Sequence, residues 1–257
     1  MAIDSKDLRK AQLIMLDMLK EFDAICQKYN LKYWLDSGTA LGAKRHKGFI
    51  PWDDDIDISM PIEDYYKFLE VAEDELSQDI FLQTKARDCD FKFDYAKLRS
   101  NKAFIVEFHE KDREVKYHQG VFVDIFPMIT LPNTDFYKKF YNDIFALIRD
   151  VSAVSLHTPN GKDLPEVREG LIESFNSLHC GWSDKDLIVA YGGQMPDLAA
   201  WFEIEKIFPL TKTEFEGLEF YVPKSIDHYL SQIYSFDYMQ LPPEDKRQIH
   251  AHEIWFK

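Results

Sequence analysis

One stretch of the sequence reads Phe49-Ile50-Pro51-Trp52-Asp53-Asp54-Asp55-Ile56-Asp57-Ile58. From Asp55 onward acidic and apolar residues alternate, which is the period of a β-strand with two different faces. On such a strand Asp53, Asp55 and Asp57 project to one face, whereas Ile56 and Ile58 project to the other. The stretch therefore predicts a strand that packs on one side and gathers carboxylates on its opposite side.

The carboxylates on this face need a counter-ion. Unit charges about 4 Å apart interact by about 4 kcal/mol at the effective dielectric of a protein surface, so they must take up protons, spread apart or bind a cation. Mg²⁺ and Mn²⁺ favour oxygen ligands and commonly bridge to substrate phosphates. We therefore predict a Mg²⁺ or Mn²⁺ site at Asp53, Asp55 and Asp57, and metal-assisted chemistry at a phosphate.

Two other interpretations of the acidic stretch are weaker. A solvated acidic turn would not need the apolar alternation that follows it. A calcium loop of the EF-hand kind would use the same three aspartates and place Asp64 at its twelfth position. However, Ile58 replaces the glycine that this loop requires, and Pro61 falls within it.

The sequence before the acidic stretch predicts an amphipathic helix. Apolar residues recur at three- and four-residue steps from Leu8 to Tyr29. Asp4 or Ser5 is available as N-cap, and Asn30 is a stop signal.

A short strand and a glycine turn are expected next. Tyr33-Trp34-Leu35 predicts the strand, and the small residues 40–43 predict a helix start. The turn Ser37-Gly38-Thr39 between them can bring backbone amides and hydroxyls near a phosphate. Lys44, Arg45, Lys47, Lys97 and Arg99 flank these elements and can neutralise a diphosphate, although each alone is more often an ordinary surface charge.

A helix and four strands are predicted after the acidic stretch. Pro61 opens a helical pattern that runs through Ala72. Asp124 stands alone in an apolar strand, where a carboxylate needs a partner. It is a candidate third arm of the metal site, with an acceptor for backbone amides or for a basic neighbour as the equal alternative. The candidate strands are Ile80 to Thr84, Phe91 to Leu98, Ala103 to Phe108 and Gly120 to Phe126.

The expected fold class is α+β, in three parts. Residues 1–133 form the N-terminal helix and a catalytic core built of neighbouring strands. Residues 134–206 form a helical subdomain interrupted near Thr158-Pro159-Asn160-Gly161. Residues 207–257 pack back on the core and contain a short helix from Ser225 to Tyr234.

Composition excludes some classes of function and location. The chain has 257 residues and a formal charge of −14, which repels a phosphate backbone and argues against nucleic acid as a partner. Cys26, Cys89 and Cys180 lack the paired spacing of a zinc site or a disulfide framework, so a reducing cytoplasm is expected. No signal peptide and no stretch of about 20 apolar residues is present, so any contact with the inner face of the membrane is peripheral.

The combined motifs resemble those of a known family. A hydrophobic strand, Gly38-Thr39, the spaced aspartates and a later strand with Asp124 resemble the nucleotidyltransferase superfold. Asp36 to Gly42, followed by Arg45, Gly48 and Ile50 to Asp57, is similar to the LicD family, which includes bacterial phosphocholine transferases and is related to fukutin and fukutin-related protein. Further similar segments are Lys97-Leu98-Arg99, Gly120 to Pro127, Phe215-Glu216-Gly217, Val222-Pro223, Tyr229-Leu230, Tyr238-Met239 and Leu241-Pro242-Pro243.

This resemblance implies a nucleotidyltransferase-like mixed β-sheet core with flanking helices. It implies transfer of phosphocholine, or of another phospho-alcohol such as ribitol phosphate, from a CDP-linked donor with release of CMP. The acceptor would be a hydroxyl of a glycan or lipid-linked glycan, such as a precursor of teichoic acid, lipopolysaccharide or capsule. Asp55, Asp57 and Asp124 would be catalytic, the same three with Asp53 would hold the metal, and the nucleotide and phosphate ligands would be Ser37, Gly38, Thr39, Arg45, Lys97 and Arg99.

Cargo and reaction type stay open. A choline cargo would need aromatic faces for cation-π attraction, and Trp52, Phe93 and Tyr95 lie in suitable segments, although core packing is the commoner use of such residues. A nucleotidyltransferase that releases pyrophosphate is one alternative function. A non-catalytic protein that binds carbohydrate or cations is the other.

Overall fold

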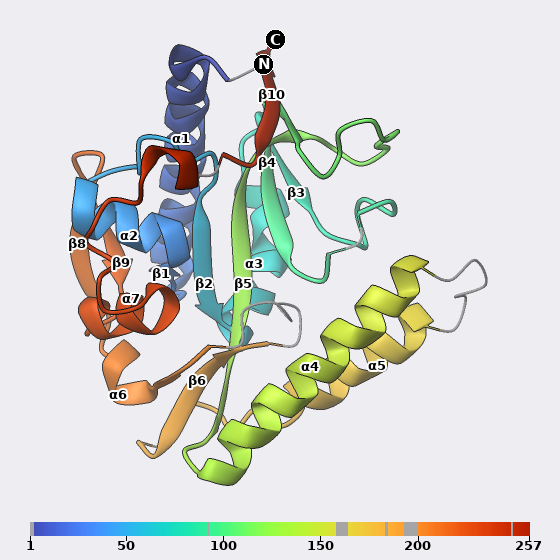
Figure 1. The fold of residues 1–257 in the computed structure, drawn as a ribbon, viewed down its shortest axis with the longest axis vertical. Helices are drawn as coiled ribbons and strands as arrows, with labels where there is room; N and C mark the ends of the chain where they lie inside the picture. The colour runs from blue at the N-terminus through green and yellow to red at the C-terminus, as the bar shows by residue number, and fades with distance from the viewer. Residues whose placement is uncertain (1–2, 92, 158–163, 183–184, 193–199, 248) are drawn as a thin grey trace.

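The fold is built on one mixed β-sheet. The computed structural model describes residues 3–91, 93–157, 164–182, 185–192, 200–247 and 249–257. Within them, eight strands form a sheet of order β1-β2-β5-β4-β10, with β3 on β4, β6 on β5 and β7 on β6 (Figure 1). The strands are β1 (Trp34–Leu35), β2 (Asp57–Pro61), β3 (Ile80–Gln83), β4 (Ala96–Glu107), β5 (Gly120–Pro132), β6 (Leu187–Tyr191), β7 (Trp201–Glu203) and β10 (Ala251–Phe256), and a separate hairpin pairs β8 (Thr211–Phe215) with β9 (Leu218–Val222).

Helices flank the sheet, as an α+β fold requires. Figure 1 shows α1 and α3 behind the sheet, α2 and α7 beside β1, and the α4–α5 pair projecting from the end of β5. None of the described helices is long and apolar enough to cross a membrane. The helices are α1 (Ser5–Tyr29), α2 (Ser37–His46), α3 (Ile62–Glu75), α4 (Asp135–His157), α5 (Leu164–Asn176), α6 (Ile204–Ile207) and α7 (Ile226–Tyr234), with a short 3₁₀ turn at Glu244–Lys246.

The first helix forms as its sequence predicts. The Asp4 side chain caps α1 by accepting from the Lys6 N–H at 2.8 Å. Asn30 ends the helix in the left-handed conformation. The apolar stripe, which includes Met15, Leu19 and Phe22, is buried against β4 and β5.

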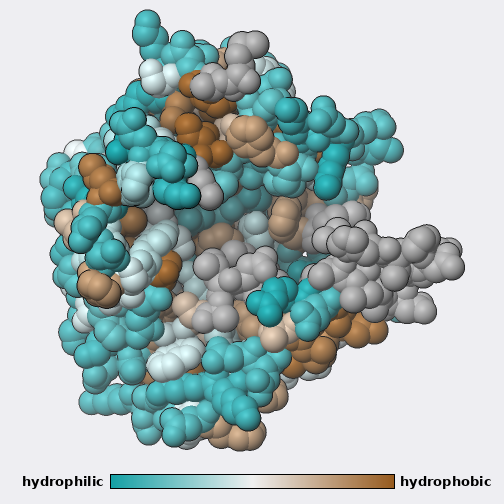
Figure 2. Space-filling view, viewed as in Figure 1, coloured by the Kyte–Doolittle hydropathy of each residue, from teal (hydrophilic) through white to brown (hydrophobic). Residues whose placement is uncertain are grey.

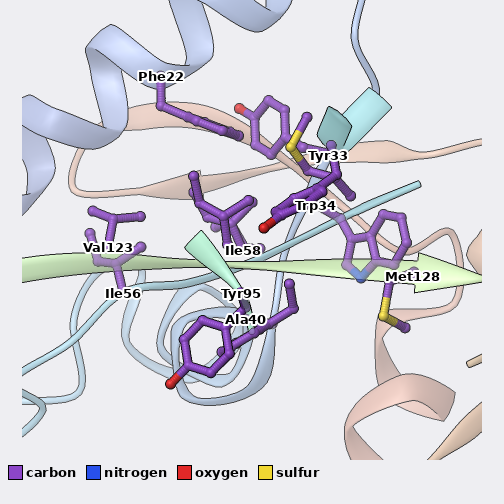
Figure 3. Close-up of a cluster of buried hydrophobic side chains, with 14 of the residues drawn as sticks. Phe22, Tyr33, Trp34, Ala40, Ile56, Ile58, Tyr95, Val123 and Met128 are labelled. Carbon is purple, nitrogen blue, oxygen red and sulfur yellow. The ribbon is translucent and has the colours of Figure 1, made fainter. Parts of the chain in front are cut away.

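β5 is the centre of the sheet and sets the register of the ionisable residues. It pairs in parallel with β2 and antiparallel with β4, so that Asp57 lies opposite Asp124, and Asp124 lies opposite Lys97. These side chains share one face because directly paired residues point to the same side of a sheet. The other face is the core: Figure 3 shows Phe22, Tyr33 and Ile58 on one side of β5 and Tyr95 on the other.

Two predicted boundaries near the acidic stretch are wrong. The strand begins at Asp57, and Asp53 and Asp55 precede it in an extended loop, although Ile56 and Ile58 are fully buried as predicted. The predicted turn Ser37-Gly38-Thr39 is instead the first turn of α2. The helix starts there because the buried Asp36 carboxylate caps it by accepting from the Ser37 N–H.

The two strands predicted at Phe91 to Leu98 and Ala103 to Phe108 are one strand, β4. The pairing of β4 with β5 shifts register between Arg99 and Phe104, and this irregularity explains the gap in the sequence pattern. Phe91, Phe93 and Tyr95 lie outside the strand and form an aromatic cluster.

Among the described residues of 134–206, α4, α5 and the start of α6 are helical, whereas two other segments are strands. The Leu187–Tyr191 segment is β6, which pairs with the second half of β5, and β7 follows it. All five residues of β6 are buried, and a short continuous apolar run does not distinguish a buried strand from a buried helix. The predicted turn at Thr158-Pro159-Asn160-Gly161 lies outside the described residues.

The C-terminal segment contributes a helix and an edge strand to the fold. α7 starts at Ile226 after Ser225, and β10 pairs with the outer edge of β4. Gly217 turns the β8–β9 hairpin with a positive φ of 77°. Next to it, Glu216 accepts from the Phe49 N–H and from Arg9, which fixes the hairpin against the start of the acidic stretch.

Candidate active site

Three ionisable side chains form a row across adjacent strands, which we call the acidic row. Asp57, Asp124 and Lys97 come from β2, β5 and β4, in register with one another. The Lys97 Nζ lies 2.7 Å from Oδ1 and 2.8 Å from Oδ2 of Asp124, and both residues are buried. Lys97 also lies 3.6 Å above the Phe122 ring. Lys97, which the sequence predicts to bind phosphate, thus forms an ion pair with Asp124.

The extended loop before β2 brings Asp53 and Asp55 to the same area. The Asp53 N–H donates to the Ile50 carbonyl at 2.9 Å, and Gln12 on α1 donates to the Asp53 carbonyl at 2.8 Å. Each of Asp53, Asp55 and Asp57 interacts electrostatically with at least one of the others, so the predicted carboxylates are gathered. Figure 2 shows that this face is hollowed between the α2–α7 side and the β3–β4 side, with hydrophilic residues at its floor.

Asp54 points away from this row and is held by the C-terminal strand. It accepts from the Ala251 N–H, and its Oδ1 lies 3.3 Å from Nδ1 of His250. The same nitrogen lies 3.8 Å from Oδ2 of Asp55. Potential ligand atoms of Asp54, Asp55 and His250 lie within 4.8 Å of one another, whereas the four predicted ligands do not form so close a group.

Burial and mutual repulsion raise the pKa of the gathered carboxyl groups. The pKa of Asp55 rises to about 7, mainly through burial and then through the charge of Asp54. Burial, followed by the charge of Asp55, raises the pKa of Asp53 and of Asp57 well above the usual range. For Asp124, burial raises the pKa and Lys97 opposes the rise. The four aspartates therefore offer oxygen donors whose negative charge the neighbouring basic groups offset only in part, which is the donor set that Mg²⁺ or Mn²⁺ prefers.

The start of α2 lies directly against these carboxylates. The Thr39 hydroxyl oxygen accepts from the Asp57 N–H at 2.8 Å. A Cβ on Gly38 would lie 3.0 Å from Oδ2 of Asp53, so the glycine permits the close approach. The Ser37 hydroxyl instead faces Asp36, at 3.3 Å. Gly38 and Thr39 thus join the site, and a phosphate-binding role for all three residues stays a prediction.

The two predicted arginine ligands are engaged elsewhere. Arg45 Nη1 donates to the carbonyls of Tyr238 and Gln240, which ties α2 to the C-terminal segment. Arg99 is 1% exposed and donates to Gln83 at 2.7 Å and to the Gly120 carbonyl at 2.8 Å. Burial lowers the pKa of each guanidinium. Both contribute positive potential near the carboxylates, and their direct contact with phosphate stays a prediction.

Of the three aromatic residues predicted to form a choline cage, two lie together and Trp52 lies elsewhere. Phe93 and Tyr95 are neighbours, with ring centroids 5.4 Å apart, and Lys97 lies 5.8 Å and 5.5 Å from their centroids. Trp52 is instead packed near Arg247, whose Cζ lies 4.5 Å from its ring centroid. Tyr65 and Tyr66 join Phe93 and Tyr95 in lining a cavity of about 360 Å³.

Asp36 is the main residue whose role the sequence did not predict. It is fully buried, and its carboxylate accepts hydrogen bonds from both Tyr191 and Tyr229, and from Ser59 on β2. Its N–H donates to the Asp57 carbonyl at 3.0 Å. Asp36 therefore joins β1, β2, β6, α2 and α7 directly beside the acidic row. Its position before Ser37-Gly38-Thr39 was the available signal, whereas nothing local indicated His250.

Gly38→Ala is expected to lower activity at least tenfold without destabilising the fold. The added methyl group displaces the Asp53 carboxylate, while alanine raises helix propensity by up to about 1 kcal/mol. Turnover and urea unfolding measure the two effects. The control is Gly170→Ala in α5, where a Cβ would meet nothing within 4 Å. Equal activity of the two variants would show that Asp53 tolerates the shift.

The metal-free protein is expected to lose stability as pH rises from 5 to 8. The folded pKa of Asp55 is raised from 3.8 to about 7, so the stability it contributes is present below pH 4 and is lost as pH rises through 7. The shift corresponds to at most roughly 4 kcal/mol. Urea unfolding in EDTA should show a smaller loss for Asp55→Asn than for the natural chain. Parallel pH profiles for the two proteins would contradict the assignment.

Comparisons with known proteins show what this chain is similar to. A family model described as LicD/FKTN/FKRP, nucleotidyltransferase domain, matches residues 30–148, which contain the whole acidic row. The lipopolysaccharide cholinephosphotransferase LicD of Haemophilus influenzae is 29% identical over 265 residues, which cover 95% of each chain. The ribitol 5-phosphate transferase FKRP of Homo sapiens is 42% identical over 40 residues, 16% of this chain and 8% of that protein. An uncharacterised protein of Rickettsia typhi is 44% identical over 62 residues, 24% of this chain and 20% of its own.

Proposed function

Because the chain belongs to the LicD family, we propose that it is a phospho-alcohol transferase that uses a CDP-linked donor and a glycan hydroxyl as acceptor. The donor would be CDP-choline or a CDP-polyol such as CDP-ribitol. The observation that carries the proposal is the row of Asp57, Asp124 and Lys97 beside the start of α2. It provides negative charge for a metal and backbone amides for a phosphate at one place.

The CDP-linked donor determines which bond forms and which bond breaks in the proposed reaction. The acceptor hydroxyl oxygen attacks the phosphorus that bears the alcohol, and the bond from that phosphorus to the CMP oxygen breaks. CMP leaves with the electron pair of that bond. The hydroxyl proton passes to a carboxylate of the site, for which Asp124 is the candidate.

The chain's own residues have separate roles in this scheme. Asp53, Asp55 and Asp57, with Asp124 as a fourth ligand or as the base, would hold Mg²⁺ or Mn²⁺, which would neutralise developing charge on the phosphates. Lys97 opposes the rise that burial causes in the pKa of Asp124 and holds its carboxylate in position. The amides at the start of α2 bind the diphosphate. The α4–α5 pair would contribute to the choice of acceptor, at the inner face of the membrane.

The cargo would be selected by the aromatic pocket. Phe93 and Tyr95, with Tyr65 and Tyr66, line one cavity, so a choline group would use these rings, and Trp52 would act elsewhere on the rim. Competition between CDP-choline and CDP-ribitol for turnover measures the preference. Loss of choline preference in Phe93→Leu, with ribitol turnover retained, is the expected result.

The product that is released distinguishes phospho-alcohol transfer from nucleotidyl transfer. The full chain is incubated with Mg²⁺, a glycan acceptor and labelled CDP-choline, CDP-ribitol or CTP. CMP release from a CDP-linked donor, abolished by EDTA, is expected. Pyrophosphate from CTP with a nucleotidylated acceptor would identify a nucleotidyltransferase, and tight donor binding without turnover would identify a non-catalytic binding protein.

A further inference from the structure

A second, larger cavity lies beside β1, at the edge of the sheet, and none of its lining residues belongs to the acidic row. Its volume is about 810 Å³, in the range of cavities that hold small molecules. Tyr33 lines it and points to the same face of the sheet as Leu35, which pairs with Ile58, away from Asp57. The cavity is bounded by the end of α1, the start of α6, the segment after α6 and the ring of Tyr221 on β9.

The floor and walls of this cavity are apolar. Cys26, Leu31 and Ile204 are buried at its lining. Trp182 and Phe208 form an edge-to-face pair with centroids 5.5 Å apart, and Tyr33 and Tyr221 form another at 5.6 Å. An alkyl or isoprenoid chain placed there would lose its contact with water at about 25 cal/mol per Å² of apolar surface.

The rim of the cavity is basic. Lys32 and Lys185 line it with exposed side chains, and Lys212 lies 4.9 Å above the Tyr221 ring. Among the described residues, no carboxylate pairs with these ammonium groups within 4.0 Å. Asp64 accepts from the Lys32 backbone N–H at 3.1 Å, and its charge interacts with that of Lys32 at longer range. The acidic lining residue Glu205 pairs with its own neighbour Lys206. Three lysines that form no ion pair with a described carboxylate thus gather at this rim, in a chain of net charge −14.

We propose that this cavity binds a lipid phosphate, with the hydrocarbon chain on the aromatic floor and the phosphate at Lys32 and Lys185. An apolar floor without charge on the rim would suit a neutral lipid, and a basic rim without the floor would suit free phosphate. The combination of the two matches an amphiphile that carries both parts. This inference does not depend on the proposed transfer reaction.

The cavity is close to the acidic row without being part of it. Phe208 in its wall contacts Trp34 on β1, with centroids 5.9 Å apart. Trp34 Nε1 donates to the Tyr229 hydroxyl at 3.3 Å, and Tyr229 donates to Asp36. A lipid phosphate bound here would therefore lie beside β1, linked to Asp36 through these contacts, and would anchor the protein to a lipid surface at that edge of the sheet.

Calorimetric titration of the full chain with dodecyl phosphate, below its critical micelle concentration, tests the proposal. One molecule is expected to bind per chain. The double variant Lys32→Glu/Lys185→Glu should bind at least tenfold more weakly, since two charge-assisted contacts become repulsive. The matched control is Lys20→Glu/Lys67→Glu, which changes two exposed lysines on α1 and α3 and should bind as the natural chain does.

A second readout locates the ligand. Binding should change tryptophan emission, and Trp182→Phe should remove most of that change while keeping the affinity within a few-fold. Three results would overturn the proposal: equal affinity for inorganic phosphate, equal affinity for the neutral dodecyl maltoside, or undiminished binding by Lys32→Glu/Lys185→Glu. Unsaturable uptake of dodecyl phosphate would also overturn it, because it indicates detergent adsorption.

Discussion

Asp57→Asn is expected to lower phospho-alcohol transfer by at least about a thousandfold, which corresponds to about 4 kcal/mol of transition-state stabilisation. Asp57 begins β2 and lies in register with Asp124. It forms no ion pair with a described residue, so its charge is available to a divalent ion. An amide of the same shape retains the packing and is a much weaker metal ligand. Initial rates of CMP release at saturating Mg²⁺ measure the loss.

The same substitution should leave the metal-free fold as stable as before or slightly more stable. Burial and the charges of four neighbouring aspartates raise the pKa of Asp57, so the removal of its charge relieves repulsion. Thermal unfolding in EDTA checks this. Asp17→Asn, at an exposed position of α1 with a surface ion pair to Lys20, is the control. If Asp57→Asn kept turnover within threefold of this control, Asp57 would have no catalytic role.

Local signals were sufficient for the elements whose structure is set locally. α1 follows from its apolar period and its two caps, Asp4 and Asn30. The burial of Ile56 and Ile58 follows from alternation, even though the strand starts at Asp57. Asp124 could be singled out because a carboxylate in an apolar strand needs a partner.

Pairing between distant segments could not be predicted in the same way. The Leu187–Tyr191 segment forms a strand because it pairs with the second half of β5. Five consecutive apolar residues have no periodicity from which this pairing could be predicted. The register shift that makes one strand of residues 96–107 is likewise set by β5. Propensity is a weak guide where tertiary contacts decide.

The candidate site shows the same division. Its aspartates lie mostly within one stretch of sequence, so their gathering was predictable. Their partners come from far along the chain: Tyr191 and Tyr229 hold Asp36, and His250 lies against Asp54. A lone tyrosine or histidine in a distant element carries no signal of such a contact.

Lys97→Met is expected to lower the free energy of unfolding by about 3–5 kcal/mol at pH 8 in metal-free protein. Both partners of the Lys97–Asp124 pair are buried, and removal of one leaves an uncompensated buried charge. Without Lys97 the pKa of Asp124 rises further, because the group that opposes the effect of burial is gone. A raised carboxyl pKa gives stability that is lost as pH rises, so the deficit should be smaller at pH 5.

A double-mutant cycle separates the pair from its surroundings. Lys97→Met/Asp124→Asn should recover most of the loss, because no unpaired charge then stays in the sheet, although the activity should not return. The control on the same strand is Lys102→Met, whose partner Asp79 is exposed, and its effect should stay within about 0.5 kcal/mol. Urea unfolding of Lys97→Met, Asp124→Asn, their double variant and Lys102→Met provides the measurement. An equally small effect at Lys97 would mean that Asp124 is neutral in the natural protein, and the proton would then have to be accepted by another carboxylate of the row.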